Sequence, residues 1–202
     1  SKIACQGITF EAMDRPDRPN LAKGLVIRHP ANETVIQRGT RFTLRETPVI
    51  YDQLHHWLAM AVKGDVAATG VDPYTWTFVR DITADPDVNT RTLERRLSDG
   101  TNFIDNEWAY AFLSTLRFMY QVDQPLRMSG EGYARRVQAS TLTAAQALPT
   151  IEIPPSPLAK IWIDSTWANL GTTQITAQVL SADVTFHSGY LPKWSLDGRS
   201  DL

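Results

Sequence analysis

The chain has 202 residues, 43% of them hydrophobic, and a formal net charge of −2 at pH 7. This composition is sufficient for one domain with a substantial core. The near-neutral charge argues against a protein that grips nucleic acid through a basic surface. A single cysteine, Cys5, excludes an intramolecular disulfide, and we expect a protein that is not secreted. Neither a signal peptide nor an apolar run long enough for a membrane span is present, so we expect no membrane partner.

Short strands are predicted in the first quarter of the chain. Alternating apolar and polar residues indicate strands at 7–11, 25–28 and 41–46. Between the first two strands, residues 14–23 are rich in charge and contain two prolines, so this stretch is predicted to be a loop.

Residues 47–64 are predicted to form an amphipathic helix. Thr47 is a suitable N-cap, Pro48 suits the first helical position, and Gly64 suits the end of the helix. Apolar residues recur at spacings of three and four, which places them on one side of the helix. The predicted apolar stripe consists of Ile50, Leu54, Trp57, Leu58 and Ala61.

The middle of the chain is predicted to be β-structure. Strands are expected at 74–79 and 91–97, separated by an acidic loop at 82–89. Asp99-Gly100 is typical of a hairpin turn into the next strand.

A long strand is predicted at 110–122. About 13 residues exceed the usual five or six of a strand. The second face is mixed in polarity, which favours contact with another element or another subunit. The predicted apolar face carries Tyr110, Phe112, Leu116, Phe118, Tyr120 and Val122, and the mixed face carries Ala111, Leu113, Thr115, Arg117, Met119 and Gln121.

A turn at 123–125 leads into a return strand at 126–137. Gly130 and Gly132 interrupt this strand, which indicates a bulge or a close approach of another group to the backbone.

The last third of the chain begins with a proline-rich segment. Residues 141–157 end in Pro154-Pro155-Ser156-Pro157, which cannot lie inside a sheet and indicates an extended connector or an arm. A strand is expected at 160–164. At 173–186 the apolar alternation changes phase near Leu180, which predicts a bulge there.

These elements predict a mainly β protein, an antiparallel β-sandwich or barrel flanked by one amphipathic α-helix, with long loops. We expect a single domain spanning residues 1–202, with the proline-rich connector or arm at about 141–157.

Residues that could carry chemistry do not form a recognisable catalytic pattern. The histidine pair His55-His56 diverges by about 100° on a helix, which does not suit one metal ion, and His29 and His187 are isolated. Cys5 has no visible basic partner, and Ser98-Asp99-Gly100 is not a nucleophile elbow. The aspartates Asp81, Asp85 and Asp87 lack the glycine and glutamate of a calcium loop and indicate an acidic turn. We therefore predict no catalytic, cofactor-binding or metal-binding residues, no cofactor and no enzyme activity.

Two further groups of side chains allow alternative interpretations. The arginines form the largest basic concentration, which could contact an acidic surface of another subunit or could be outward positions of strands. The tryptophans could stack against sugars, although most are better explained as core residues. The arginines are Arg91, Arg95, Arg96, Arg135 and Arg136. The tryptophans are Trp57, Trp76, Trp108, Trp162 and Trp167.

The order of the elements carries more information than any single residue. A strand leads into the helix, an aromatic strand and a loop follow, and then a hairpin, a long strand and a glycine-containing return. The corresponding segments are Arg41-Phe-Thr-Leu-Arg-Glu-Thr47, Tyr74-Thr-Trp-Thr-Phe78, Thr92-Leu-Glu-Arg-Arg-Leu-Ser-Asp-Gly100, Phe112-Leu-Ser-Thr-Leu-Arg-Phe118 and Leu126-Arg-Met-Ser-Gly-Glu-Gly-Tyr133. This succession, over roughly residues 40–137, resembles the major tail tube proteins of long-tailed bacteriophages. The turn at 123–125 and the proline-rich block at 149–157 depart from the family pattern.

The resemblance implies a structural virion protein that assembles into stacked, hexameric rings. These rings would form the hollow tail tube, assembled in the host cytoplasm and located in the virion tail. The implied partners are other copies of the chain and the tail terminator, tape measure and distal tail proteins, with DNA passing through without specific binding. A tail terminator, a baseplate hub or a secretion-system tube subunit would share these features. The alternative is a carbohydrate-binding β-sandwich module of a phage tail tip.

Overall fold

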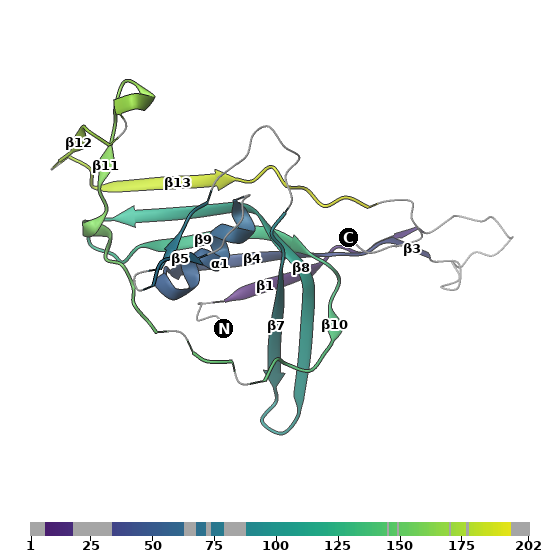
Figure 1. Cartoon of the computed structure of the whole chain (residues 1–202). Coiled ribbons are helices and arrows are strands. Elements are labelled where there is room, and N and C mark those ends of the chain that lie inside the picture. Colours follow the sequence, from purple (N-terminus) through teal and green to yellow (C-terminus); the bar gives the residue numbers. More distant parts are fainter. Residues whose placement is uncertain are drawn as a thin grey trace, which may run out of the picture.

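The computed structural model describes residues 7–17, 34–62, 68–71, 74–78, 88–144, 146–148, 150–169, 171–176 and 178–194. It confirms a mainly β fold with one α-helix (Figure 1). The elements are β1 (Ile8–Ala12), β2 (Arg15–Asp17), β3 (Thr34–Gln37), β4 (Thr40–Pro48), α1 (Tyr51–Ala61), β5 (Ala68–Thr69), β6 (Thr75–Trp76), β7 (Arg91–Ser98), β8 (Phe103–Gln121), β9 (Arg127–Ala134), β10 (Gln138–Ala139), η2 (Ser156–Leu158), β11 (Ile161–Trp162), η3 (Trp167–Asn169), β12 (Gln174–Ile175) and β13 (Ser181–His187).

An antiparallel sheet of seven strands dominates the fold and curls into a half-barrel. Its order is β1-β4-β9-β8-β10, and both β13 and β7 also pair with β8. Eight strands of this kind would be needed to close a small barrel. The pairs β2–β3, β5–β6 and β11–β12 form small separate sheets.

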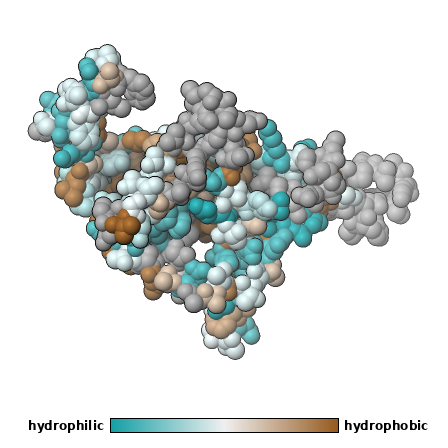
Figure 2. All heavy atoms as spheres, viewed as in Figure 1, coloured by the Kyte–Doolittle hydropathy of each residue, from teal (hydrophilic) through white to brown (hydrophobic). Residues whose placement is uncertain are grey.

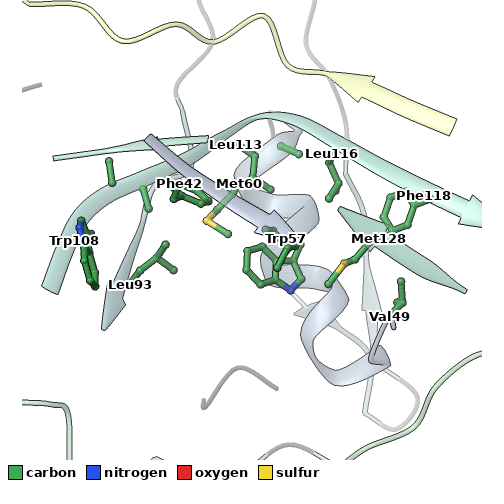
Figure 3. Packing of buried hydrophobic residues seen from close by; sticks show 14 of the residues in the cluster. Phe42, Val49, Trp57, Met60, Leu93, Trp108, Leu113, Leu116, Phe118 and Met128 are labelled. Atoms are coloured by element: carbon green, nitrogen blue, oxygen red, sulfur yellow. The ribbon is translucent and has the colours of Figure 1, made fainter. Parts of the chain in front are cut away.

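The helix α1 covers one face of the sheet and completes the core. Trp57 and Met60 point from α1 towards Phe42 of β4 and Leu116 of β8 (Figure 3). All four side chains are almost completely buried. Residues far apart in the sequence therefore meet in one apolar layer between helix and sheet. Burial of each large apolar side chain contributes about 1.5–3 kcal/mol.

The helix begins later than the sequence predicts. Thr47 and Pro48 are the last residues of β4, where they pair with Met128 and Arg127 of β9, so the predicted N-cap is wrong. Ile50 takes the N-cap position without a side-chain hydrogen bond. Pairing with a strand some 80 residues away overrides the local capping preference. Gly64, the predicted end of the helix, lies outside the described residues.

The buried face of α1 also differs in part from the predicted stripe. Trp57 and Ala61 are buried as predicted, whereas Leu54 and Leu58 are only partly buried. Met60 and Gln53, which the stripe did not include, are buried instead. The buried face of the helix is therefore rotated about the helix axis relative to the predicted apolar stripe.

The long strand β8 starts seven residues earlier than predicted and bends. Tyr110 has φ of 56° in the middle of the strand, a left-handed conformation that costs about 1–3 kcal/mol for a non-glycine residue. Residues before the bend pair with β7 and β10, and residues after it pair with β9 and β13, except that Ala111 still pairs with Arg91 of β7. One strand thus belongs to the hairpin at one end and to the curved sheet at the other (Figure 1).

A bulge in β8 changes which side chains face the core. The pairing register with β9 shifts between Leu113 and Thr115. Leu113 therefore joins the core cluster with Leu116 and Phe118, although it was predicted to lie on the opposite face. Phe112 was predicted to share a face with Leu116, but its ring contacts Tyr133 and Tyr190 outside that cluster.

Gly130 and Gly132 mark a close approach, one of the two predicted possibilities. A Cβ on Gly132 would lie 2.1 Å from the carbonyl oxygen of Phe112 and 2.5 Å from the ring of Phe42. A Cβ on Gly130 would lie 2.9 Å from the carbonyl oxygen of Thr115. Without side chains at these two positions of β9, Phe42 and the leucines of β8 can pack beneath α1.

The described part of the proline-rich segment lies extended against the domain. The amide of Tyr51 at the start of α1 donates to the Glu152 carbonyl, and Asp52 accepts from the amide of Thr150. Further along, the Leu126 amide donates to the Pro154 carbonyl. The connector thus satisfies one of the free amides at the helix N-terminus, where no side chain forms a cap.

Three smaller predictions differ from the structure. Residues 15–17, inside the predicted loop at 14–23, form β2 and pair with β3. The predicted bulge near Leu180 is a break, because β12 ends at Ile175 and β13 begins at Ser181. Of the predicted strands at 74–79 and 160–164, only the two-residue pairs β6 and β11 are strands. The predicted strand at 25–28 lies outside the described residues.

Candidate self-association surface

β1 and β13 are the edge strands of the part of the sheet that lies beneath α1, whereas β7 and β10 pair with β8 at its other end. Among the described residues, β1 pairs only with β4, and β13 pairs only with β8. An edge strand presents unpaired backbone amides and carbonyls on its outer side, which makes it a site for pairing with another strand. The chain therefore presents complementary backbone edges at its two lateral borders.

The edge strand β13 is apolar on one face. Val184 and Phe186 alternate along it and remain more than two-fifths exposed. The ring of Phe186 packs edge-on against Phe118, with 6.0 Å between ring centroids. Phe186 thus extends the apolar contacts of the core cluster to an exposed position at the edge of the sheet. An exposed apolar edge of this kind marks an interaction or aggregation surface.

The face of the sheet away from α1 carries paired charges. Arg41 donates to Glu131 across β4 and β9, with 2.6 Å between nitrogen and oxygen, and Arg127 donates to Glu46 at 3.1 Å. Arg117 of β8 forms a double hydrogen bond with Asp183 of β13. That hydrogen bond lowers the pKa of Asp183 below its usual value. Each pair combines opposite charges on neighbouring strands, so these three ion pairs add no net charge to this face of the sheet.

The β7–β8 hairpin projects from the sheet and ends in an ordered turn (Figure 1). The Asp99 carboxylate accepts from the amides of Asn102 and Thr101 at 2.6 and 2.9 Å. These hydrogen bonds lower the pKa of Asp99 to about 2, so the carboxylate stays charged at neutral pH. The predicted hairpin turn at Asp99-Gly100 is confirmed, with Gly100 at φ of 96°.

The arginine cluster is largely engaged inside the chain. Arg96 makes a two-pronged pair with Asp105 on the opposite strand of the hairpin, at 2.7 Å for each bond. Arg95 lies over the stacked rings of Phe10 and Trp108, about 5 Å from each centroid. Arg135 lies over Tyr110 at 3.9 Å. The contacts of Arg95, Arg96 and Arg135 thus stabilise the hairpin and the bend of β8.

The histidine pair lies on the outer part of α1. The ring centroids of His55 and His56 are 3.8 Å apart, closer than their divergence along the helix suggests, and His55 also stacks on Trp76. Both residues are partly buried. Burial is the main cause that lowers the pKa of His56 to about 4, with neighbouring His55 and Arg91 adding to it. His187 is exposed on β13.

The tryptophans divide into two groups. Trp57 and Trp108 are core residues, as predicted. Trp76 and Trp162 are more than a third exposed, so the core interpretation is wrong for Trp76. The Tyr74 and Trp76 rings lie at 49° to each other and do not form the flat platform that stacking against a sugar requires. Trp167 lies in η3.

Within the described part of the chain, no three histidine, cysteine or acidic side chains gather as metal ligands. No helix among these residues has both the length and the apolarity to cross a membrane. Cys5, His29 and the aspartates Asp81, Asp85 and Asp87 lie outside the described residues.

The exposed apolar edge was visible in the sequence only as alternation. The pattern of Ala182, Val184 and Phe186 is the same as that of a strand facing a core, and sequence reasoning did not single it out as a surface. Its position at the border of the sheet depends on pairing with β8. No protein-family model matches the chain, and no curated protein shows significant sequence similarity to it.

Proposed function

We propose that this protein is a structural subunit of a phage tail tube, which assembles without catalysis into stacked rings around a hollow channel. The observation that carries the proposal is the pair of edge strands β1 and β13, with the exposed apolar residues Val184 and Phe186 on the second. Joining edges of neighbouring copies continues the curved sheet from copy to copy. A ring closes this series and leaves neither the β1 edge nor the β13 edge exposed.

The polar face of the sheet supports the same proposal. Its ion pairs join neighbouring strands and combine opposite charges. When copies join edge to edge, one face of the sheet lines the inside of the ring. A surface of paired charges, in a chain of net charge −2, lets a polyanion pass without the counterion release that drives tight DNA binding.

The aromatic residues do not favour the carbohydrate-binding alternative. That function needs two or three exposed rings in one plane, whereas Tyr74 and Trp76 are tilted and Trp76 stacks on His55. The proposed function therefore rests on self-association.

Negative-stain electron microscopy of the purified protein over a concentration series tests the proposal. We expect rings or hollow tubes of uniform diameter. The variant Val184→Lys places a charge on the edge strand and should abolish them, because an edge lysine opposes strand pairing. Val71→Lys makes the same change at a more exposed residue outside the seven-stranded sheet, and should assemble like the unmodified chain. Dispersed particles at all concentrations would contradict the proposed function.

A further inference from the structure

The edge strands β1 and β13 run in the same direction. The strands β1, β4, β9, β8 and β13 pair antiparallel in that order, so an odd number of alternating strands separates one edge from the other. The arrows of β1 (purple) and β13 (yellow) accordingly point the same way at opposite borders of the sheet (Figure 1). If the sheet continues from β13 of one copy to β1 of the next with the α1 side on the same face, the two joined strands are therefore parallel.

The hydrogen bonds inside the sheet show which backbone groups of β1 face outwards. The Gly7 carbonyl accepts from the amide of Arg45, next to β1. At the other end, the amide of Met13 donates to the carbonyl of Gly39. Backbone groups of successive residues in a strand point to opposite sides, so the residues of alternate parity turn their amides and carbonyls away from β4. On β1 these residues are Ile8, Phe10 and Ala12.

The same reasoning identifies the outward backbone groups of β13. The Leu180 carbonyl accepts from the amide of Val122. The Ser188 amide donates to the carbonyl of Ser114. Even-numbered residues of β13 therefore face β8, and the odd-numbered residues present their amides and carbonyls at the outer side of the edge. These residues are Ser181, Asp183, Thr185 and His187.

The two sets of outward groups complement each other in a parallel pair. In such a pair, each outward-facing residue bonds to the two residues that flank the one opposite it. With Thr185 opposite Thr9, the Thr185 amide donates to the Ile8 carbonyl and the Thr185 carbonyl accepts from the Phe10 amide. The residues two positions before and after Thr185 find partners on β1 in the same way, so the backbone bonds continue along the whole joint.

This register also matches the apolar face of the two strands. Ile8 and Phe10 are partly buried and pack against the core cluster, and Val184 and Phe186 lie on the same, α1 side of the sheet. Figure 2 shows hydrophobic atoms along the β13 side of the sheet. With Thr185 opposite Thr9, Val184 lies beside Ile8 and Phe186 lies beside Phe10. The joint thus covers the exposed apolar side chains of β13 with apolar side chains of β1.

The polar face of the two strands is matched in the same register. Glu11 and His187 are exposed on the side of the sheet away from α1. The register places them opposite each other, where the imidazole can donate to the carboxylate. A shift of two residues in either direction keeps the faces but separates Glu11 from His187 and Phe10 from Phe186, so the side chains favour one register.

Pairing of like edges is the alternative arrangement of two copies. Two copies of β13 related by a two-fold axis pair antiparallel, and the assembly then stops at a dimer. That dimer leaves the β1 edge of both copies uncovered. A joint between β13 and β1 covers both edges of every copy inside the series, which is the more complete protection of exposed strand edges.

We propose that β13 of one copy adds in parallel to β1 of a second copy, with Thr185 opposite Thr9. The inference rests on the proposed function and deepens it, because it specifies the direction and the register of the joint between neighbouring subunits.

Disulfide trapping tests the direction and the register. In a Cys5→Ser background, Thr9→Cys and Thr185→Cys are combined and oxidised with copper phenanthroline. Opposite Cα atoms of neighbouring strands lie about 4.8 Å apart, within the range that a disulfide spans. We expect a series of covalent dimers, trimers and larger species. Both threonines are exposed, so thermal unfolding of the reduced variant should match that of the unmodified chain.

Two controls separate this joint from the alternatives. Thr9→Cys with Ser181→Cys keeps both thiols on the same face but displaces one by about 13 Å along β13, and should give no covalent series. Thr185→Cys alone should give no dimer, because its counterpart in the proposed joint is Thr9. Efficient dimers from Thr185→Cys alone would overturn the parallel joint in favour of the two-fold pair, and a covalent series from the Ser181 control would overturn the register.

Charge exchange gives an independent test of the polar face. His187→Glu places a second carboxylate beside Glu11 and should lower the yield of trapped species about fivefold, because like charges on opposite residues repel. Adding Glu11→Lys pairs opposite charges at the same place and should restore the yield. An unchanged yield from His187→Glu would overturn the contact between Glu11 and His187.

The outcomes distinguish this joint from the proposed function. Rings or tubes in the microscope, with no covalent series from the Thr9 and Thr185 pair, would overturn the joint and leave the tube function standing. A covalent series from a protein that forms open filaments and no rings or tubes would support the joint and overturn the tube function. Absence of both would overturn both.

Discussion

The two halves of β8 both carry large apolar side chains but have different surroundings. Residues 112–121 lie beneath α1, where Leu113 and Leu116 are fully buried. Residues 103–110 form the hairpin with β7, where Phe103 and Ile104 are exposed. Both halves contain large apolar side chains on a strand. The comparison shows that apolar alternation specifies a strand with one face to cover, but not whether the same chain or another copy covers it.

The first prediction compares the loss of stability from truncating a buried and an exposed side chain of β8. Leu116→Ala removes a fully buried side chain beneath α1 and should lower the free energy of unfolding by about 3 kcal/mol, within the 2–5 kcal/mol typical of such changes. Ile104→Ala, on the exposed half, should change it by less than about 0.5 kcal/mol. Urea unfolding followed by tryptophan fluorescence measures both. Equal losses of unfolding free energy would show that Ile104 is packed as closely as Leu116.

The second prediction concerns the strand that faces the covered half of β8. Gly132→Ala forces a Cβ against the Phe112 carbonyl and the Phe42 ring, and should lower the free energy of unfolding by about 1–3 kcal/mol. Gly39→Ala places a Cβ at ordinary contact distances, 3.6 Å from Trp194, and is the matched control with little expected loss. A neutral Gly132→Ala would mean that helix and sheet are packed less closely than the structure shows.

The third and smallest effect is a pH dependence from the outer side of α1. The pKa of His56 is about 4 in the folded chain and about 6.5 when unfolded. Between these values the unfolded chain binds more protons, so stability is complete above about pH 6.5 and falls as the pH drops towards 4. Thermal unfolding of the unmodified chain should shift down over this window. His56→Gln should reduce the shift, and an unchanged slope would exclude His56 as its source.

The sequence predicted the local elements well where short-range patterns decide them. The mainly β class, the helix around Trp57, the turn at Asp99-Gly100 and the close approach at Gly132 are all confirmed. Each depends on residue type and spacing over a few positions, so the physical cause is contained in the sequence itself. The predicted absence of catalytic and metal-binding residues stays a prediction.

Tertiary structure alone decided the features that depend on distant partners. The extension of β4 through Pro48 requires β9, and the phase change at Leu113 requires a bulge opposite Gly132. Likewise, the exposed edge at Val184 exists because β13 pairs with β8. Local propensities differ by about 1 kcal/mol or less per residue, whereas burial of one large side chain contributes more, so long-range packing determined where the elements begin, bend and remain uncovered.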